Sequence, residues 1–250
     1  MAFRPKLWLT LGAALTLVAA CGEQGAPGET GGEAGATSAA SGEGEGGEGE
    51  GGSAAGEAGA AGGYAGVPAE SLPALRIAHL EGFFLVARRS QAVEGDEFAA
   101  ALAGQGLAEV YDPQAADFEG SGLDLAVLRR AAETGSEADL TAAVAALEAA
   151  RTAAGGNNAV VAGALSDIAA GIYQEVLVDG AVDPVEYQHS LGAALAAQQI
   201  ATAANLPTKG DIDALVAMWH GVVAPEEVAE ATPAGQVQAQ ASRIRLASAG

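Results

Sequence analysis

From residue 68 onward, leucine, valine and alanine recur at intervals of three and four residues, the spacing that places side chains on one face of a helix. No alternating, strand-like pattern interrupts this spacing. The pattern predicts helices over 72–93, 96–111, 122–134, 136–154, 158–178, 183–204 and 208–220, and a turn or short helix over 225–232. We therefore expect an all-α domain over 68–232, an antiparallel bundle of about six to seven helices.

Helix-capping residues support these boundaries. Ser136-Glu137-Ala138-Asp139 has the form of a capping box, which is typical of the first turn of a helix. Asp183 precedes Pro184 and Glu186, a combination that predicts a helix start just after the stop at Asp179-Gly180 and therefore a tight helical hairpin. In the second helix, Gly104-Gln105-Gly106 predicts a break.

The segment before this domain consists almost entirely of Gly, Ala, Ser and Glu. Such a chain has too few apolar side chains to build a core and behaves as a coil, with a reach on the order of 40 Å. We expect residues 21–67 to form a disordered Gly/Glu/Ala tether. Residues 233–250, rich in Gln, Ala and Ser, are expected to be a flexible tail.

The N-terminal residues have the layout of a secretory signal over 1–20. Arg4 and Lys6 precede an apolar run over 7–17, and small residues lead to Cys21. The apolar run is shorter than the about 20 residues that a membrane-spanning helix needs. The sequence therefore predicts export, with an ordinary signal peptide that happens to contain a cysteine as one interpretation.

Val18-Ala19-Ala20-Cys21 closely resembles the lipobox of bacterial lipoproteins. The resemblance implies that Cys21 is acylated and that several acyl chains hold the mature protein on a membrane of the bacterial cell envelope. Gly22 stands where an aspartate would retain an enteric lipoprotein in the inner membrane, so an outer-membrane location facing the periplasm is expected.

Composition excludes some classes of function. The net charge is −21, with 32 acidic and 11 basic residues, so nucleic acid is not an expected partner. The acidic balance is explained by solubility, although it could also attract cations. Cys21 is the only cysteine, which excludes an internal disulfide.

Histidines are the candidate ligand residues of the domain. His79 falls between Leu75 and Phe83 on the apolar face of its predicted helix, so we expect it to be buried, either as a core residue or as a ligand or proton carrier. His220, at a predicted helix C-terminus, is explained by the helix dipole.

Glu186 and His189 form the second candidate. Glu186-Tyr187-Gln188-His189 matches the Glu-x-x-His unit of di-iron bundles, but such a site needs a second copy, which the sequence lacks. The apolar positions of this helix predict that both residues lie away from its buried face. We treat His79, Glu186 and His189 together as candidate ligands of a metal ion of unknown identity.

Signatures of catalysis are missing from the sequence. No Gly-x-Ser-x-Gly elbow and no phosphate-binding glycine loop after a strand is present. We therefore expect that the protein is not an enzyme.

The hairpin over 172–188 is similar to the soluble helical region that precedes the membrane part of some bacterial high-affinity iron permeases. It also resembles stand-alone exported helical proteins of unassigned function, which carry a histidine corresponding to His79 and a His-rich turn after the second helix. At that turn this sequence has Gly104-Gln105-Gly106 and Tyr111-Asp112-Pro113 instead. The resemblance implies a helical fold and a role in metal or iron handling.

Two hypotheses follow for function. The first is a membrane-anchored accessory module that binds a ligand or an envelope protein, with a role in metal or iron handling. The alternative is a non-catalytic envelope scaffold that acts through protein contacts only.

Overall fold

The computed structural model describes residues 60–178, 181–220 and 231–248, which all belong to one structural unit. Within these ranges the fold is all-α apart from one short hairpin, so the predicted fold class is confirmed. The α-helices are α2 (Leu72–Glu94), α3 (Asp96–Gly106), α4 (Leu125–Thr134), α5 (Glu137–Ala154), α6 (Asn158–Tyr173), α7 (Pro184–Ala203), α8 (Lys209–Val216) and α9 (Ala234–Ser248). The other elements are η1 (Ala69–Ser71), which precedes α2, the π-helix η2 (Leu107–Tyr111), η3 (Asp112–Phe118), the antiparallel strands β1 (Leu177–Val178) and β2 (Ala181–Val182), and η4 (Ala217–Trp219).

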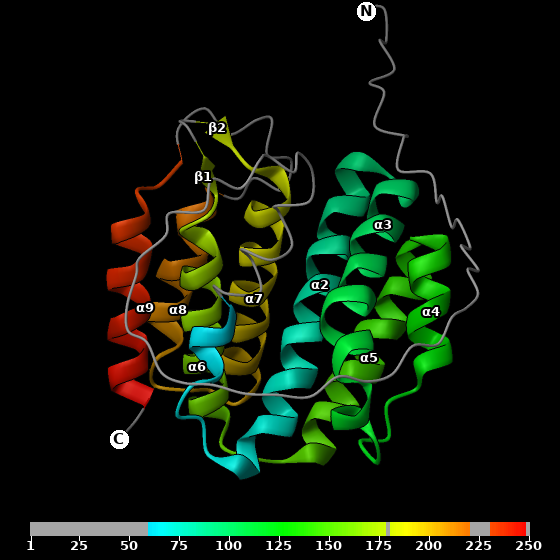
Figure 1. Ribbon diagram of the computed structural model, residues 1–250, viewed down its shortest axis with the longest axis horizontal. Coiled ribbons are helices and arrows are strands. Elements are labelled where there is room, and N and C mark those ends of the chain that lie inside the picture. The colour runs from blue at the N-terminus through cyan, green and yellow to red at the C-terminus, as the bar shows by residue number, and fades with distance from the viewer. Residues whose placement is uncertain (1–59, 179–180, 221–230, 249–250) are drawn as a thin grey trace, which may run out of the picture. The chain divides into compact units, whose positions relative to one another are not determined.

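Helix α2 lies in the middle of this arrangement (Figure 1). It packs against α3 and α5 on one side, where α4 covers both, and against α7 and α6 on the other. Helices α8 and α9 complete the second group by packing on α7 and α6, respectively. Buried side chains from all these helices form one hydrophobic core, so α2 belongs to both groups of helices.

Polar caps start several helices where the sequence predicted them. The Ser136 hydroxyl accepts a hydrogen bond from the backbone N–H of Asp139 at the start of α5. The Asp183 carboxylate accepts hydrogen bonds from the N–H groups of Val185 and Glu186, and Pro184 lies in the first turn of α7. These contacts satisfy backbone donors that have no partner within the helix, which explains the sharp helix starts.

Two predicted interruptions are wrong. Helix α6 ends at Tyr173, earlier than the Asp179-Gly180 stop, and β1 and β2 occupy the connection to α7. Gly104-Gln105-Gly106 does not break the helix, because α3 continues through it into the π-helix η2. At Gly106 a Cβ atom would lie 2.6 Å from the Cβ of Phe83, so this glycine permits close packing against α2.

The expected tether, 21–67, extends too far along the chain. Residues 60–64 form a helical turn, and Val67 is buried in the core. A Cβ atom on Gly63 would lie 2.3 Å from the side chain of Ile168, so this turn rests directly on α6. Residues 21–59, including Cys21, lie outside the described residues, as do 1–20 and 221–230.

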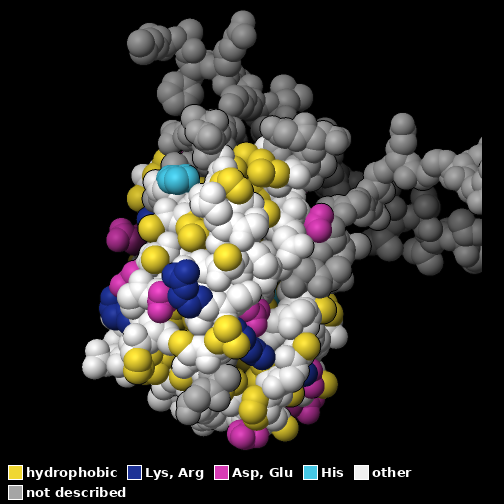
Figure 2. Space-filling view, turned by 90° about the vertical axis from the view of Figure 1, so that its left-hand side faces the viewer, with side chains coloured by type: hydrophobic (Ala, Val, Ile, Leu, Met, Phe, Trp, Pro, Cys, Tyr) yellow, Lys and Arg dark blue, Asp and Glu magenta, His cyan; other side chains and the backbone are white. Residues whose placement is uncertain are grey.

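The prediction of a flexible tail over 233–250 is wrong, because α9 is a packed helix. Val237, Ala241 and Ile244 are fully buried against α6 and α8. Buried Gln240 donates a hydrogen bond from Nε2 to the backbone carbonyl of Asp211, 2.8 Å away. On the face of the molecule near α9, acidic and basic side chains are interspersed (Figure 2), as in the ion pair between Arg245 and Asp167.

Candidate functional site

One face of α2 borders a pocket of about 660 Å³. Four residues follow one another along this face at helical spacing: Leu72, Arg76, His79 and Phe83. The remaining walls come from the 60–64 turn, from η2 and η3, and from α6 and α7; they are formed by Ala60, Ala61, Tyr64, Glu109, Val110, Pro113, Gln114, Asp117, Ile172 and His189. The pocket therefore joins segments that are far apart in the sequence.

His79 lies in the wall of this pocket and is 7% exposed. Its Nδ1 is 3.0 Å from the Tyr64 hydroxyl, whereas its buried Nε2 has no hydrogen-bond partner among the described residues. Burial, and to a smaller extent the nearby His189, lower the pKa of His79 to about 4, so the imidazole is neutral at pH 7. The predicted burial of His79 is confirmed, and one of its nitrogens is left without a partner.

His189 borders the same pocket from α7 and is only 5% exposed, so the prediction that it lies away from the buried face is wrong. Helix α7 is enclosed by α2, α6 and α8, which leaves it little free surface. The Nε2 of His189 lies 3.4 Å from Gln105 Oε1, and the Nδ1 of His189 lies 3.5 Å from Glu109 Oε2. Because burial lowers the pKa of His189 to about 4, we interpret the contact with Glu109 as one between a carboxylate and a neutral ring.

The two histidines flank the aromatic ring of Phe83. The ring centroids of His79 and Phe83 are 5.9 Å apart, and those of Phe83 and His189 are 4.7 Å apart. Tyr64 continues this row of rings at 6.0 Å from His79. The structure therefore brings together two of the predicted candidates, and their separation by Phe83 gives the pocket an aromatic wall.

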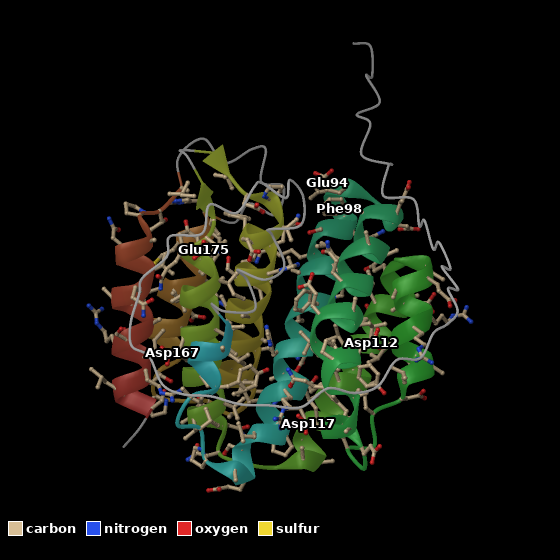
Figure 3. The ribbon with its side chains drawn as sticks, in the orientation of Figure 1. Glu94, Phe98, Asp112, Asp117, Asp167 and Glu175 are labelled. Atoms are coloured by element: carbon tan, nitrogen blue, oxygen red, sulfur yellow. The ribbon has the colours of Figure 1, made fainter. Side chains whose placement is uncertain are left out.

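Arg76 connects α2 to η3. Its guanidinium forms a 2.8 Å ion pair with Asp117, which lies beside the lower part of α2 (Figure 3), and its Nε donates a hydrogen bond to Gln114. The Arg76 side chain is therefore already paired with protein groups. The unpartnered Nε2 of His79 is therefore the polar atom here that most clearly lacks a partner.

Glu186 is also buried, at 3% exposure, which again contradicts the prediction that it lies away from the buried face. Its Oε2 has no hydrogen-bond partner among the described residues. Burial, together with the negative charges of Asp183, Glu109 and Glu175, raises the pKa of Glu186 to about 7. Glu186 does not border the pocket that His79 and His189 share.

Within the described part of the chain, no group of three or more His, Cys, Asp or Glu side chains is arranged to hold a metal ion. Glu186 and His189 are therefore not part of such a group in these residues. His220 lies apart from the pocket, in a left-handed conformation at φ 53°, with its Nε2 3.2 Å from the Thr232 hydroxyl.

Several pocket residues were not predicted from the sequence. Tyr64 follows a glycine-rich segment, and nothing in its neighbours indicates a contact with His79. Glu109 lies in η2, and π-helical turns are frequent at functional sites, but their positions are not readable from residue spacing. Gln105 belongs to the segment that was interpreted as a helix break.

Comparisons of the chain with protein-family models, with curated proteins and with solved structures found no match. Among the described helices, none combines the length and the apolar character that a membrane crossing requires.

Proposed function

We propose that this chain is an exported, lipid-anchored binding module whose ligand occupies the pocket beside His79, and that it does not catalyse a reaction. The observation that carries the proposal is the buried, unpartnered Nε2 of His79 in the wall of a pocket of about 660 Å³. A buried polar atom without a partner costs about 1–3 kcal/mol. A ligand that contacts Nε2 would offset this cost.

The pocket limits the chemistry of this ligand. Its volume lies within the range of small-molecule sites, and the rings of Phe83 and Tyr64 favour a flat or apolar body. The ligand must also present a group that hydrogen-bonds or coordinates the imidazole of His79. Depending on which ring nitrogen carries the proton, Nε2 either donates a hydrogen bond or offers a lone pair.

A role in metal or iron handling is favoured by one contact. Metal-binding histidines usually donate their other ring N–H to a second group, and Tyr64 is placed to accept such a bond from His79 Nδ1. Because the described residues offer no three-ligand group, we propose that a metal would reach this pocket together with ligands of its own.

Metal analysis of the full chain, purified without chelators, tests this role. We expect iron, copper or zinc, supplied alone or with a small chelating ligand, to be bound or titratable in the wild type and to be lost in His79→Ala. His220→Ala is the matched control, because His220 does not border the pocket. A wild type that neither contains nor takes up any of these metals rules out the metal version.

Membrane anchorage is the second part of the proposal. The lipobox-like Val18-Ala19-Ala20-Cys21 supports acylation of Cys21 and a location in the bacterial cell envelope, with Gly22 favouring the outer membrane on its periplasmic side. Mass spectrometry of the exported protein is expected to find acyl chains on its N-terminal cysteine. A bare thiol, or a Cys21→Ser variant that remains equally bound to membranes, contradicts this part.

The alternative, an envelope scaffold that acts through protein contacts only, makes a different prediction. It requires a consistent protein partner in crosslinked cells and no effect of His79→Ala on that partner. If the pocket takes up no ligand and such a partner is recovered, the scaffold is the better account.

A further inference from the structure

A second concave surface lies on another part of the domain. It is a groove of about 710 Å³ between α2, α5 and α7. Its lining residues are Leu85, Arg88, Arg89, Val144, Glu148, Leu195, Gln198, Gln199, Thr202 and Ala203. None of them borders the pocket at His79, so the two sites are independent.

Most basic side chains in the described residues pair with a carboxylate, but Arg88 and Arg89 in this groove, like Arg129 on α4, do not. Arg76, Arg130, Arg151, Lys209, Arg243 and Arg245 each lie within 4.0 Å of a carboxylate. Arg88 and Arg89 have no ion pair or hydrogen bond within the ranges that the structure describes, although the chain has 32 acidic residues. Their charges are therefore available to a molecule that enters the groove.

Neither arginine is hydrogen-bonded to the buried carboxyl group of Glu81, although the charge of Arg88 acts on it. Glu81 is fully buried; its Oε2 lies 2.9 Å from Nε of Arg151, and its Oε1 accepts a hydrogen bond from Gln199 at 2.7 Å. Both oxygens of Glu81 thus have other partners. Glu148 on α5 also lines the groove, and its negative charge disfavours a ligand with many negative charges.

The groove combines positive charge with a hydroxyl group and apolar side chains. Guanidinium groups pair with the oxygens of carboxylates and phosphates more strongly than with neutral acceptors. Thr202 offers a hydroxyl, and Leu85, Val144 and Leu195 offer apolar contact beside the arginines. We propose that this groove binds a small organic anion, with its carboxylate or phosphate at Arg88 and Arg89 and its apolar body along the groove.

Nuclear magnetic resonance of the full chain in zwitterionic detergent tests the proposal through the arginine Nε–H signals. The probes are phenyl phosphate and benzoate, with benzyl alcohol as the neutral control. We expect saturable shifts of the Arg88 and Arg89 signals with at least one anionic probe. Binding by phenyl phosphate alone would identify a phosphate site, and binding by benzoate would identify a carboxylate site.

The double variant Arg88→Gln/Arg89→Gln is expected to weaken this binding about tenfold or more, because each charged hydrogen bond contributes substantially to affinity. Arg129→Gln is the matched control, since Arg129 is an exposed arginine on α4, outside the groove. The proposal is overturned if benzyl alcohol shifts the same signals equally. It is also overturned if neither anion binds, or if the double variant binds as the wild type does. His79→Ala should leave this binding unchanged, which separates the outcome from that of the proposed function.

Discussion

Gly82 on α2 and Gly192 on α7 bring the backbones of these two helices into direct contact. A Cβ atom added to Gly82 would lie 2.7 Å from the carbonyl oxygen of Gly192, and one added to Gly192 would lie 2.7 Å from that of Gly82. Such distances are shorter than any relaxed packing contact. The two helices carry His79 and His189, so this contact lies one turn from each of these histidines along its helix.

Gly82→Ala is therefore expected to separate α2 from α7 and to lower the free energy of unfolding by about 1–3 kcal/mol, the usual cost of overpacking a core. Chemical denaturation measures this change. Gly104→Ala is the control, because a Cβ atom there meets nothing within 4 Å, and it should leave stability unchanged or increase it. Equal destabilisation by both variants would show that the close helix contact is not the cause.

A buried ion pair joins α2 to α5. Nε of Arg151 lies 2.9 Å from Oε2 of Glu81, and the two side chains are 6% and 0% exposed. Replacing Arg151 with Met leaves the buried Glu81 carboxyl group without its main partner. Because burial raises the pKa of Glu81 to about 7, the typical cost of about 3–5 kcal/mol for an unpaired buried charge is expected above pH 7, where Glu81 is ionised.

The exposed pair between Arg130 and Asp139, also at 2.9 Å, provides the comparison. Because Arg130 is 72% exposed, Arg130→Met should cost less than about 1 kcal/mol. Thermal and urea unfolding of both variants distinguish these values, and similar losses in the two variants would contradict the structural role of Glu81.

Glu186 makes stability depend on pH in a defined direction. Because its folded pKa is raised from 4.5 to about 7, the folded protein holds more protons than the unfolded chain between these values. Its contribution to stability therefore falls as the pH rises from 4.5 to 7. Glu186→Gln should exceed the wild type in stability by about 1–2 kcal/mol at pH 8, and this gain should shrink toward pH 5.

His79 and His189 make stability change with pH in the opposite direction. Their folded pKa values, lowered from 6.5 to about 4, mean that the unfolded chain binds more protons between pH 4 and 6.5. Stability is consequently lost as the pH falls through this range. Urea unfolding at several pH values measures both trends, and a Glu186→Gln advantage that does not change with pH is incompatible with the buried carboxyl.

The Tyr64 hydroxyl ties the start of the described domain to His79. Tyr64→Phe removes the 3.0 Å hydrogen bond to Nδ1 and leaves both ring nitrogens of His79 without a protein partner, at a cost of about 1–2 kcal/mol. Tyr111→Phe serves as the control, because the ring of Tyr111 packs on Phe118 and its hydroxyl forms no hydrogen bond with the described residues. Denaturant unfolding compares the two variants, and equal stabilities would mean that the contact with His79 contributes nothing.

The helix boundaries were largely predictable because caps and stops depend on neighbouring residues. Ser136 and Asp183 begin their helices as expected, and Gly95 ends α2. Burial of His189 and Glu186 was not predictable in this way, since α7 is enclosed by three other helices and its apolar face does not reveal that. Helix α9 was likewise predicted to be a flexible tail. Its buried face consists mainly of only three apolar side chains, Val237, Ala241 and Ile244.

The candidate site, too, was predictable from the sequence only in part. The position of His79 on an apolar helix face predicted its burial. Its contact with Tyr64 and its separation from His189 by a single aromatic ring depend on how distant segments pack, which residue spacing does not encode.

Native mass spectrometry of the full chain, released from the membranes of the cells that make it, tests most directly whether the pocket at His79 holds a ligand. We predict a small-molecule adduct near one per chain in the wild type and in Arg88→Gln/Arg89→Gln, and its loss in a folded His79→Phe variant. A wild type without any adduct, or the same adduct in His79→Phe, would contradict the proposed binding function.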